Sequence, residues 1–199
     1  MNNHNEKIFK TMREYFAGAN GCFDNGDLDS FIVNLNEIIR LKPNCASAWY
    51  NRGIVLGDKG DYDNAITNYD EVIRLKPDHN KAWNNRGVIW AVIKNELDKA
   101  LADLNESIRL KGDSASAWNN RGNVWKKKGE YDKAIADYDE AISINPKDTS
   151  AWCNRGNTWK AKGEYDKAIA DFDEALRLDP CNQHAIRNRN DAVSMISRM

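Results

Sequence analysis

The chain has 199 residues, of which 41% are hydrophobic and 30% charged, and its formal net charge is −1. This composition is typical of a folded protein, and the balance of acidic and basic residues gives no reason to expect nucleic acid or an anionic membrane as a partner. The N-terminus is polar, and no apolar run approaches the roughly 20 residues that span a bilayer. We therefore expect a cytoplasmic protein that does not bind membranes, with free thiols at its four cysteines.

A five-residue phrase, Trp-x-Asn-Arg-Gly, organises the chain. It begins at Trp49, Trp83, Trp118 and Trp152, at intervals of 34 or 35 residues. A fixed period of this length is typical of small helical units that stack on one another and contact only their neighbours. The sequence therefore predicts a solenoid and not a closed globule.

Each period predicts an antiparallel pair of helices. Positions are counted here from the tryptophan as 0. Gly at +4 and a bulky residue at +7 share one face of a helix with the tryptophan, and Gly at +11 is suited to end that helix. Ala at +16 and an aromatic residue at +20 then share one face of a second helix, which Pro at +28 ends. In one copy these residues are Trp118, Gly122, Trp125, Gly129, Ala134, Tyr138 and Pro146.

The period divides the whole chain. We expect a polar segment over 1–11, a degenerate first repeat over 12–45, four further repeats over 46–79, 80–114, 115–148 and 149–182, and a C-terminal capping helix over 183–199. In the first repeat, Tyr15 takes the tryptophan position and Phe31 replaces the small residue at +16. The third repeat is one residue longer and has Gly112 in place of proline. The capping helix is expected to present a polar outer face, since a solenoid must cover its last packing surface.

This pattern resembles that of the tetratricopeptide repeat family, W-x₂-L-G-x₂-Y…A-x₃-F…P, over about residues 12–199. The resemblance implies an all-α, right-handed superhelix of five helix pairs plus the capping helix. It also implies that one face of the first helices lines an inner, concave groove. One departure is the arginine that replaces leucine at +3, in Arg52, Arg86, Arg121 and Arg155.

A row of asparagines occupies position +2. Its members are Asn51, Asn85, Asn120, Asn154 and Asn188. An asparagine side chain can pair with both the C=O and the N–H of a peptide, and packed helices about 8–10 Å apart match about three residues of extended chain. The row therefore predicts binding of an extended peptide by its backbone, and it resembles the asparagine ladder of O-linked N-acetylglucosamine transferases. The alternative is that these side chains are solvated or bridge neighbouring helices.

The other positions on the inner face vary and are where we expect specificity. The N-terminal half of this row is apolar with one acid, at Ile54, Asp58, Val88 and Val92. The C-terminal half is rich in amides and basic groups, at Asn123, Lys126, Lys127, Asn157 and Lys160. A ligand with an apolar segment followed by acidic groups would complement this row. The alternative is a solvated face.

The arginines at +3 lie within the packed stripe of the first helix. Burial of a guanidinium without a partner is costly. Acids recur on the second helices at +19 and +21, including Asp70, Asp137, Asp139, Asp171 and Asp173. The sequence therefore predicts Arg–Asp pairs between repeats; the alternative is direct contact with phosphate or RNA.

No residue pattern indicates catalysis. The histidines, His4, His79 and His184, are scattered, and there is no phosphate loop, nucleophile elbow or cluster of metal ligands. We therefore predict a non-enzymatic interaction module that binds a protein or peptide and needs no metal or cofactor.

Three other functions are weighed against this one. The first is a homo-oligomeric scaffold, in which the first repeat docks into another molecule's groove. The second is RNA or nucleotide binding through the arginine and lysine rows, which the net charge of −1 disfavours. The third, a co-chaperone that grips a C-terminal carboxylate, is disfavoured because its lysine at +1 is replaced by Phe16, Tyr50, Asn84, Asn119 and Cys153.

Overall fold

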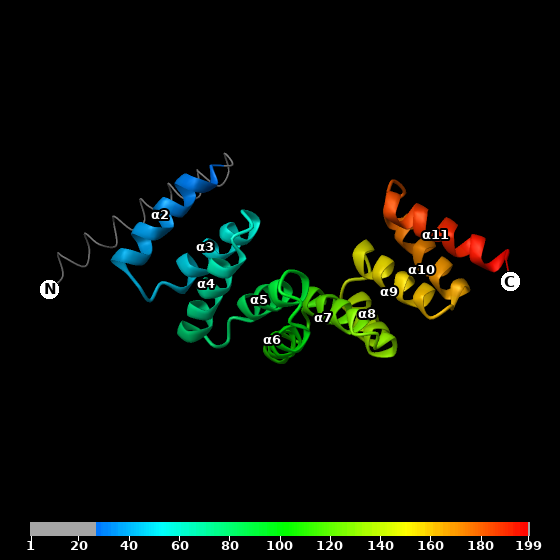
Figure 1. Cartoon of the computed structure of the whole chain (residues 1–199), viewed down its shortest axis with the longest axis horizontal. Coiled ribbons are helices and arrows are strands. Elements are labelled where there is room, and N and C mark those ends of the chain that lie inside the picture. Colours follow the sequence, from blue (N-terminus) through cyan, green and yellow to red (C-terminus); the bar gives the residue numbers. More distant parts are fainter. Residues whose placement is uncertain (1–26, 199) are drawn as a thin grey trace. The chain divides into compact units, whose positions relative to one another are not determined.

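The structure, a computed structural model, describes residues 27–198. In that range every regular element is an α-helix (Figure 1). The helices are α2 (Leu28–Leu41), α3 (Ala46–Asp58), α4 (Tyr62–Leu75), α5 (Asn80–Val92), α6 (Leu97–Leu110), α7 (Ala115–Lys127), α8 (Tyr131–Ile144), α9 (Thr149–Ala161), α10 (Tyr165–Leu178) and α11 (Gln183–Ile196). The all-α prediction is thereby confirmed, whereas the predictions for Tyr15 and for the segment 1–11 lie outside the described residues.

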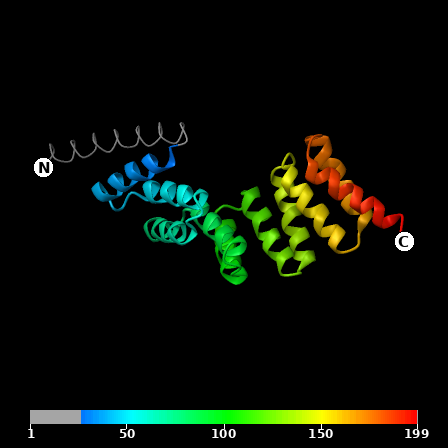
Figure 2. The ribbon, with the colours of Figure 1, turned by 45° about the horizontal axis from the view of Figure 1, so that its top comes forward.

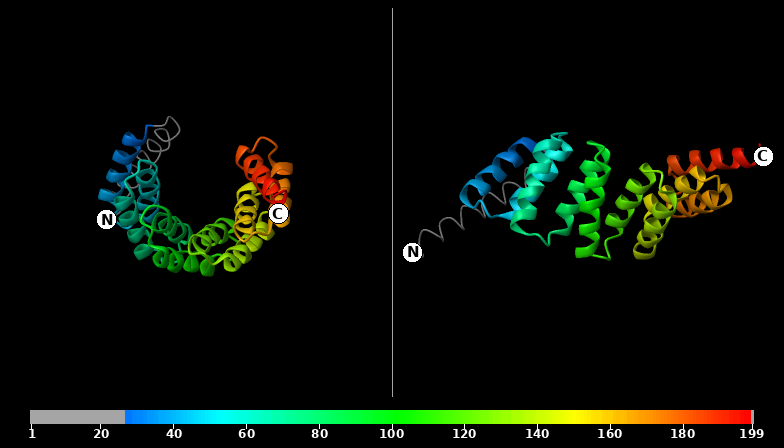
Figure 3. Two further views of the ribbon diagram at one scale, coloured as in Figure 1. Left: turned by 45° about the vertical axis from the view of Figure 1, so that its right-hand side comes forward. Right: turned by 60° about the horizontal axis from the view of Figure 1, so that its bottom comes forward.

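The chain divides into two compact units, Met1–Ile89 and Trp90–Met199, with the boundary inside α5. In the first unit α2 packs on α3 and α3 on α4 (Figure 3). In the second unit α6 packs on α7, and each helix from α7 to α11 packs on the next (Figure 2). Each unit is thus built from helices that contact their near neighbours in the chain, as in a solenoid. None of the described helices has the length and apolar character needed to cross a membrane.

The glycine at +4 allows the two helices of a repeat to approach closely. A Cβ atom on Gly53 would lie 2.8 Å from the ring of Tyr69, one on Gly122 would lie 2.6 Å from Tyr138, and one on Gly156 would lie 2.9 Å from Phe172. These aromatic residues, at +20, are buried. The second helix therefore places a buried aromatic ring directly on the backbone of the first.

The indole of each repeat ties the first helix to the loop before it. Its Nε1–H donates to a backbone carbonyl six residues earlier: Trp49 to Pro43 at 2.7 Å, Trp83 to Pro77 at 2.9 Å, Trp118 to Gly112 at 2.7 Å and Trp152 to Pro146 at 2.9 Å. Gly112 serves as well as proline here because the bond uses only a carbonyl oxygen.

Glycine at +11 ends the first helix in the left-handed region, with φ of 81° at Gly60, 79° at Gly129 and 81° at Gly163. In the longer third repeat Asn95 takes this role with φ of 56°. There the amide of Glu96 donates to the carbonyl of Trp90 at 2.8 Å, so the +7 carbonyl is paired as in the other repeats. The turn absorbs the extra residue, and Val92 and Ile93 are exposed beside it.

Helix α11 covers the end of the second unit. Asn182 caps it by accepting from the amide of Ala185, and Ala185 and Ala192 pack against α9 and α10. The prediction of a polar outer face is wrong in part, because Val193, Met195 and Ile196 are each 40% exposed. In three other repeats a lysine of the second helix lies over the tryptophan at +7, and the described residues contain no helix after α11.

Candidate functional site

In the first unit, the asparagine row is represented by Asn51 on α3 and Asn85 on α5, both half-buried. Asn85 donates from Nδ2 to the hydroxyl of Tyr50 on α3 at 3.3 Å, and its Oδ1 accepts from Asn84 at 3.2 Å. This asparagine therefore bridges two consecutive first helices, through a +1 residue of the preceding repeat.

In the second unit, Asn120, Asn154 and Asn188 lie on α7, α9 and α11 and are also half-buried. Asn154 repeats the bridge, donating from Nδ2 to Oδ1 of Asn119 at 3.1 Å. Its own Oδ1 has no partner within residues 27–198. Asn188 accepts from Lys160 at 2.8 Å and donates to the backbone carbonyl of His184 at 2.9 Å. The amide of Asn154 is therefore oriented by a neighbouring helix while its carbonyl oxygen stays available.

Sequence reasoning missed the residues that hold these asparagines. The ring of His79 lies against Tyr50, with centroids 4.7 Å apart, and burial lowers the pKa of His79. The ring Nε2 of His184 lies 3.2 Å from Nδ2 of Asn157 and 3.0 Å from Nδ2 of Asn188. Both histidines lie at the start of a first helix, within two turns of the +2 position, which is the signal that could have identified them.

The remaining row positions of the first unit are Ile54, Asp58 and Val88. Ile54 and Val88 are half-buried and Asp58 is exposed. Burial, together with smaller effects of Tyr50 and Asp58, raises the pKa of the nearby Tyr69 to about 12. This part of the row is therefore mainly apolar.

In the second unit the row is polar and basic. Nζ of Lys160 lies 3.7 Å from Oδ2 of Asp191. Lys126 has no acidic partner within residues 27–198, and its pKa is lowered by burial and by the charge of Lys160. Asn123 instead accepts from the hydroxyl of Tyr138 at 2.8 Å, and Lys127 donates to the carbonyl of Ala91 at 2.9 Å. Lys126 and Lys160 are thus brought together, whereas Asn123 and Lys127 are engaged within the fold.

The arginines at +3 are paired on both sides. Arg121 donates from Nε and Nη2 to the two oxygens of Asp137, at 2.8 and 2.7 Å, and Arg155 pairs with Asp171 in the same way, at 2.9 and 2.6 Å. These partners, at +19, lie in the arginine's own repeat. Nη1 of Arg155 reaches back to Asp139 of the preceding repeat, at 2.5 Å. The predicted pairing between repeats is therefore right for +21 and wrong for +19, because the first helix packs on its own second helix as well.

Comparisons with known proteins agree on the fold. The sequence model of the family described as tetratricopeptide repeat matches residues 46–79, 115–148 and 149–180. No curated protein sequence matches the chain.

Solved structures are similar over most of the chain. A crystal structure of MamA is 27% identical, with 86% of this chain and 93% of that chain covered and a TM-score of 0.74. MamA from Desulfovibrio magneticus RS-1 is 23% identical, with 87% and 97% covered and a TM-score of 0.78. YrrB, described as a TPR protein with an unusual peptide-binding site, is 20% identical, with 92% and 97% covered and a TM-score of 0.72.

Proposed function

This chain belongs to the tetratricopeptide repeat family, and we propose that it is a non-enzymatic interaction module that binds an extended peptide or a partner helix along its first helices. Repeats of this kind present surfaces for protein partners. YrrB, whose fold is similar, is described as having a peptide-binding site. The observation that carries the proposal is the row of half-buried asparagines, in which the amides of Asn85 and Asn154 are oriented by the preceding first helix.

The row of the second unit supports backbone binding best. The bond from Asn154 to Asn119 removes rotamer freedom from the amide before a ligand arrives. Its Oδ1 then remains to accept from a peptide N–H. A side chain that is ordered in advance loses less entropy on binding, so each hydrogen bond contributes more to affinity.

The charges beside this row indicate the ligand's chemistry. Lys126 and Lys160 lie near one another, and Lys126 has no acidic partner within residues 27–198. A ligand carboxylate placed there would relieve the repulsion between the two ammonium groups. We therefore propose a peptide that carries an acidic residue opposite these lysines.

Removal of the asparagines tests the backbone interaction. The probe is a peptide selected from a random library on the wild-type chain, with its Kd measured by calorimetry. In the double variant Asn120→Ala and Asn154→Ala, the loss of two net hydrogen bonds of about 1 kcal/mol each predicts a Kd raised roughly thirtyfold. Single N-methylations of the peptide backbone should weaken binding to the wild type and have little further effect on the double variant.

Asn190→Ala is the matched control, because Asn190 is an exposed asparagine on α11 outside the row. The control should bind the peptide as the wild type does. An unchanged Kd in the double variant, with its melting temperature retained, would rule out the asparagines as the peptide-binding groups.

A further inference from the structure

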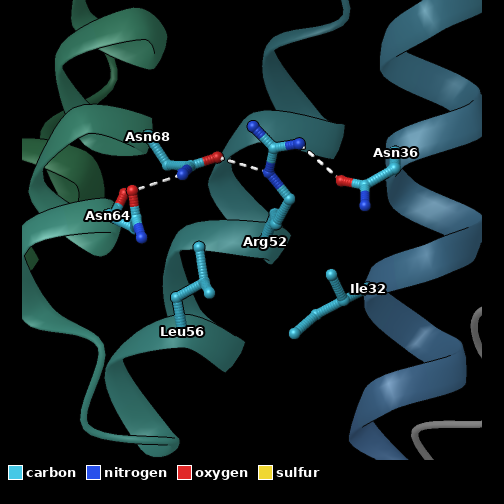
Figure 4. A pocket seen from close by; sticks show the side chains of 6 residues that line it. All are labelled: Ile32, Asn36, Arg52, Leu56, Asn64 and Asn68. Atoms are coloured by element: carbon cyan, nitrogen blue, oxygen red, sulfur yellow. Dashed lines mark hydrogen bonds between the residues drawn. The ribbon is translucent and has the colours of Figure 1, made fainter.

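A pocket of about 280 Å³ opens among α2, α3 and α4 of the first unit, around the guanidinium of Arg52 (Figure 4). Its lining consists of Ile32, Asn36, Arg52, Leu56, Asn64 and Asn68. None of these residues belongs to the asparagine row or carries an acid. The pocket exists because three positions of this repeat depart together from the pattern of the later repeats.

The first departure is at +19, where Asn68 stands in place of aspartate. In the later repeats Asp137 and Asp171 each offer two oxygens to an arginine. Asn68 offers one, which accepts from Nε of Arg52 at 2.8 Å, while its Nδ2 donates to the carbonyl of Asn64 at 2.7 Å. Asn68 is buried, at 3% exposed, so this amide pair is fixed in place.

The other two departures remove a cover. In the later repeats a lysine at +15 or +16 lies over the tryptophan at +7: Lys99 on Trp90 at 4.7 Å, Lys133 on Trp125 at 4.6 Å and Lys167 on Trp159 at 4.5 Å. In this repeat the residue at +7 is Leu56 instead of tryptophan, and the residue at +15 is Asn64 instead of lysine. Both side chains are smaller than those they replace, so the space that the lysine and tryptophan fill elsewhere stays open.

The result is a half-buried cation whose partners are neutral. Nη1 of Arg52 donates to Oδ1 of Asn36 at 2.5 Å, and Nη2 has no acceptor within residues 27–198. Nδ2 of Asn36 has no acceptor in that range either. Burial lowers the pKa of Arg52, whereas carboxylates raise that of Arg155 against the opposing effect of burial.

We propose that this pocket binds a carboxylate carried on a short aliphatic stem. The carboxylate supplies the negative charge that Asp137 and Asp171 supply to Arg121 and Arg155, and it lies beside the guanidinium of Arg52 and Nδ2 of Asn36. Ile32 and Leu56 provide an apolar wall for the stem. Arginine suits this ligand because its planar donors match the two oxygens of a carboxylate. The carboxylate can belong to a free metabolite or to an acidic side chain of a partner protein.

Two probes separate these sources. Glutarate represents the free acid, and the capped tripeptide acetyl-Gly-Glu-Gly-amide represents a protein side chain, with its glutamine analogue as the neutral control. Binding is followed by the shift of the Nε–H signal of Arg52 in the ¹⁵N-labelled full chain. Glutarate or the glutamate peptide should produce a saturable shift, and the glutamine peptide should not.

Two variants close the pocket in the manner of the later repeats. Asn68→Asp gives Arg52 an internal carboxylate, and the double variant Leu56→Trp with Asn64→Lys restores the cover. Each should weaken binding roughly tenfold or more, the loss expected for a hydrogen-bonded charge. Both use residues that the fold accepts at the same positions, so thermal melts should show no loss of stability.

Asp137→Asn is the matched control. It leaves Arg121 with two amide acceptors, as Arg52 has, but keeps Lys133 stacked on Trp125, and it should create no new site. Tighter binding of the peptide supports a partner protein as the source, and tighter binding of glutarate supports a free acid. Absence of binding by both probes, equal binding in the closed variants, or a new site of equal strength in Asp137→Asn overturns the proposal.

Discussion

At the residue scale, two glycines on the same helix have opposite roles. Gly53 and Gly57 both lie in α3. A Cβ on Gly53 would lie 2.8 Å from the buried ring of Tyr69, whereas a Cβ on Gly57 would meet nothing within 4 Å. The first glycine is required by packing, and the second only lowers the helix propensity of α3.

Alanine substitutions at these two positions should therefore change stability in opposite directions. Gly53→Ala should lower the free energy of unfolding by about 1–3 kcal/mol, the usual cost of overpacking. Gly57→Ala should raise it by roughly 0.5–1 kcal/mol through helix propensity. Urea unfolding followed by circular dichroism measures both. If the two variants shift the midpoint in the same direction, the close contact with Tyr69 does not limit packing.

At the element scale, the arginines at +3 tie three helices together. Arg155 on α9 pairs with Asp139 on α8 and with Asp171 on α10. The side chain of Asp171 is only 5% exposed, and burial raises its pKa while Arg155 opposes that shift. Burial of such a pair carries a desolvation penalty. Removal of one partner lowers the free energy of unfolding further, since the other charge is left buried with too few partners.

Truncation of acids on α10 tests this difference. Asp171→Ala should destabilise the chain by about 2–3 kcal/mol, less than for a fully buried pair because Asp139 still contacts Arg155. Glu174→Ala removes an acid of the same helix that pairs with the exposed Arg177 and should have a much smaller effect, because exposed pairs are screened by water. Thermal melts of the two variants should differ clearly, and equal melting temperatures would contradict a structural role of the arginine row.

At the scale of the whole molecule, stability is distributed along the chain. Each unit is built from contacts between helices close in sequence, such as α3 with α4 and α9 with α10. In arrays of this kind stability is approximately a sum of local terms, so regions can open separately.

Hydrogen exchange should reveal this division. In the Asp171→Ala variant, amide exchange should accelerate in α8–α11 and stay near the wild-type rate in α2–α4. Mass spectrometry of peptic fragments resolves the two regions. Equal acceleration in both would show that the chain unfolds as one cooperative body.

Much of the fold follows from the period alone. The offsets of Trp118, Gly122, Gly129 and Tyr138 predict helix pairs in register, and α7 and α8 lie where these offsets place them. The candidate site was less predictable. The period predicts that the +2 asparagines lie on first helices. It does not predict the bond from Asn154 to Asn119, because stacking of two helices brings these side chains together. Val193 on α11 is 40% exposed, although the pattern places its position on the packed face of a first helix.

The repeated pattern of large and small residues is enough to predict a stack of helix pairs, because stacking is the efficient way for such a pattern to bury its apolar faces. Which polar side chains find a partner depends on the packing of helices against one another, and a pattern along the chain does not contain that information. Asn68, Leu56 and Asn64 are unremarkable when read along the chain. They define a pocket around Arg52 because packing places these three smaller or neutral side chains next to its guanidinium.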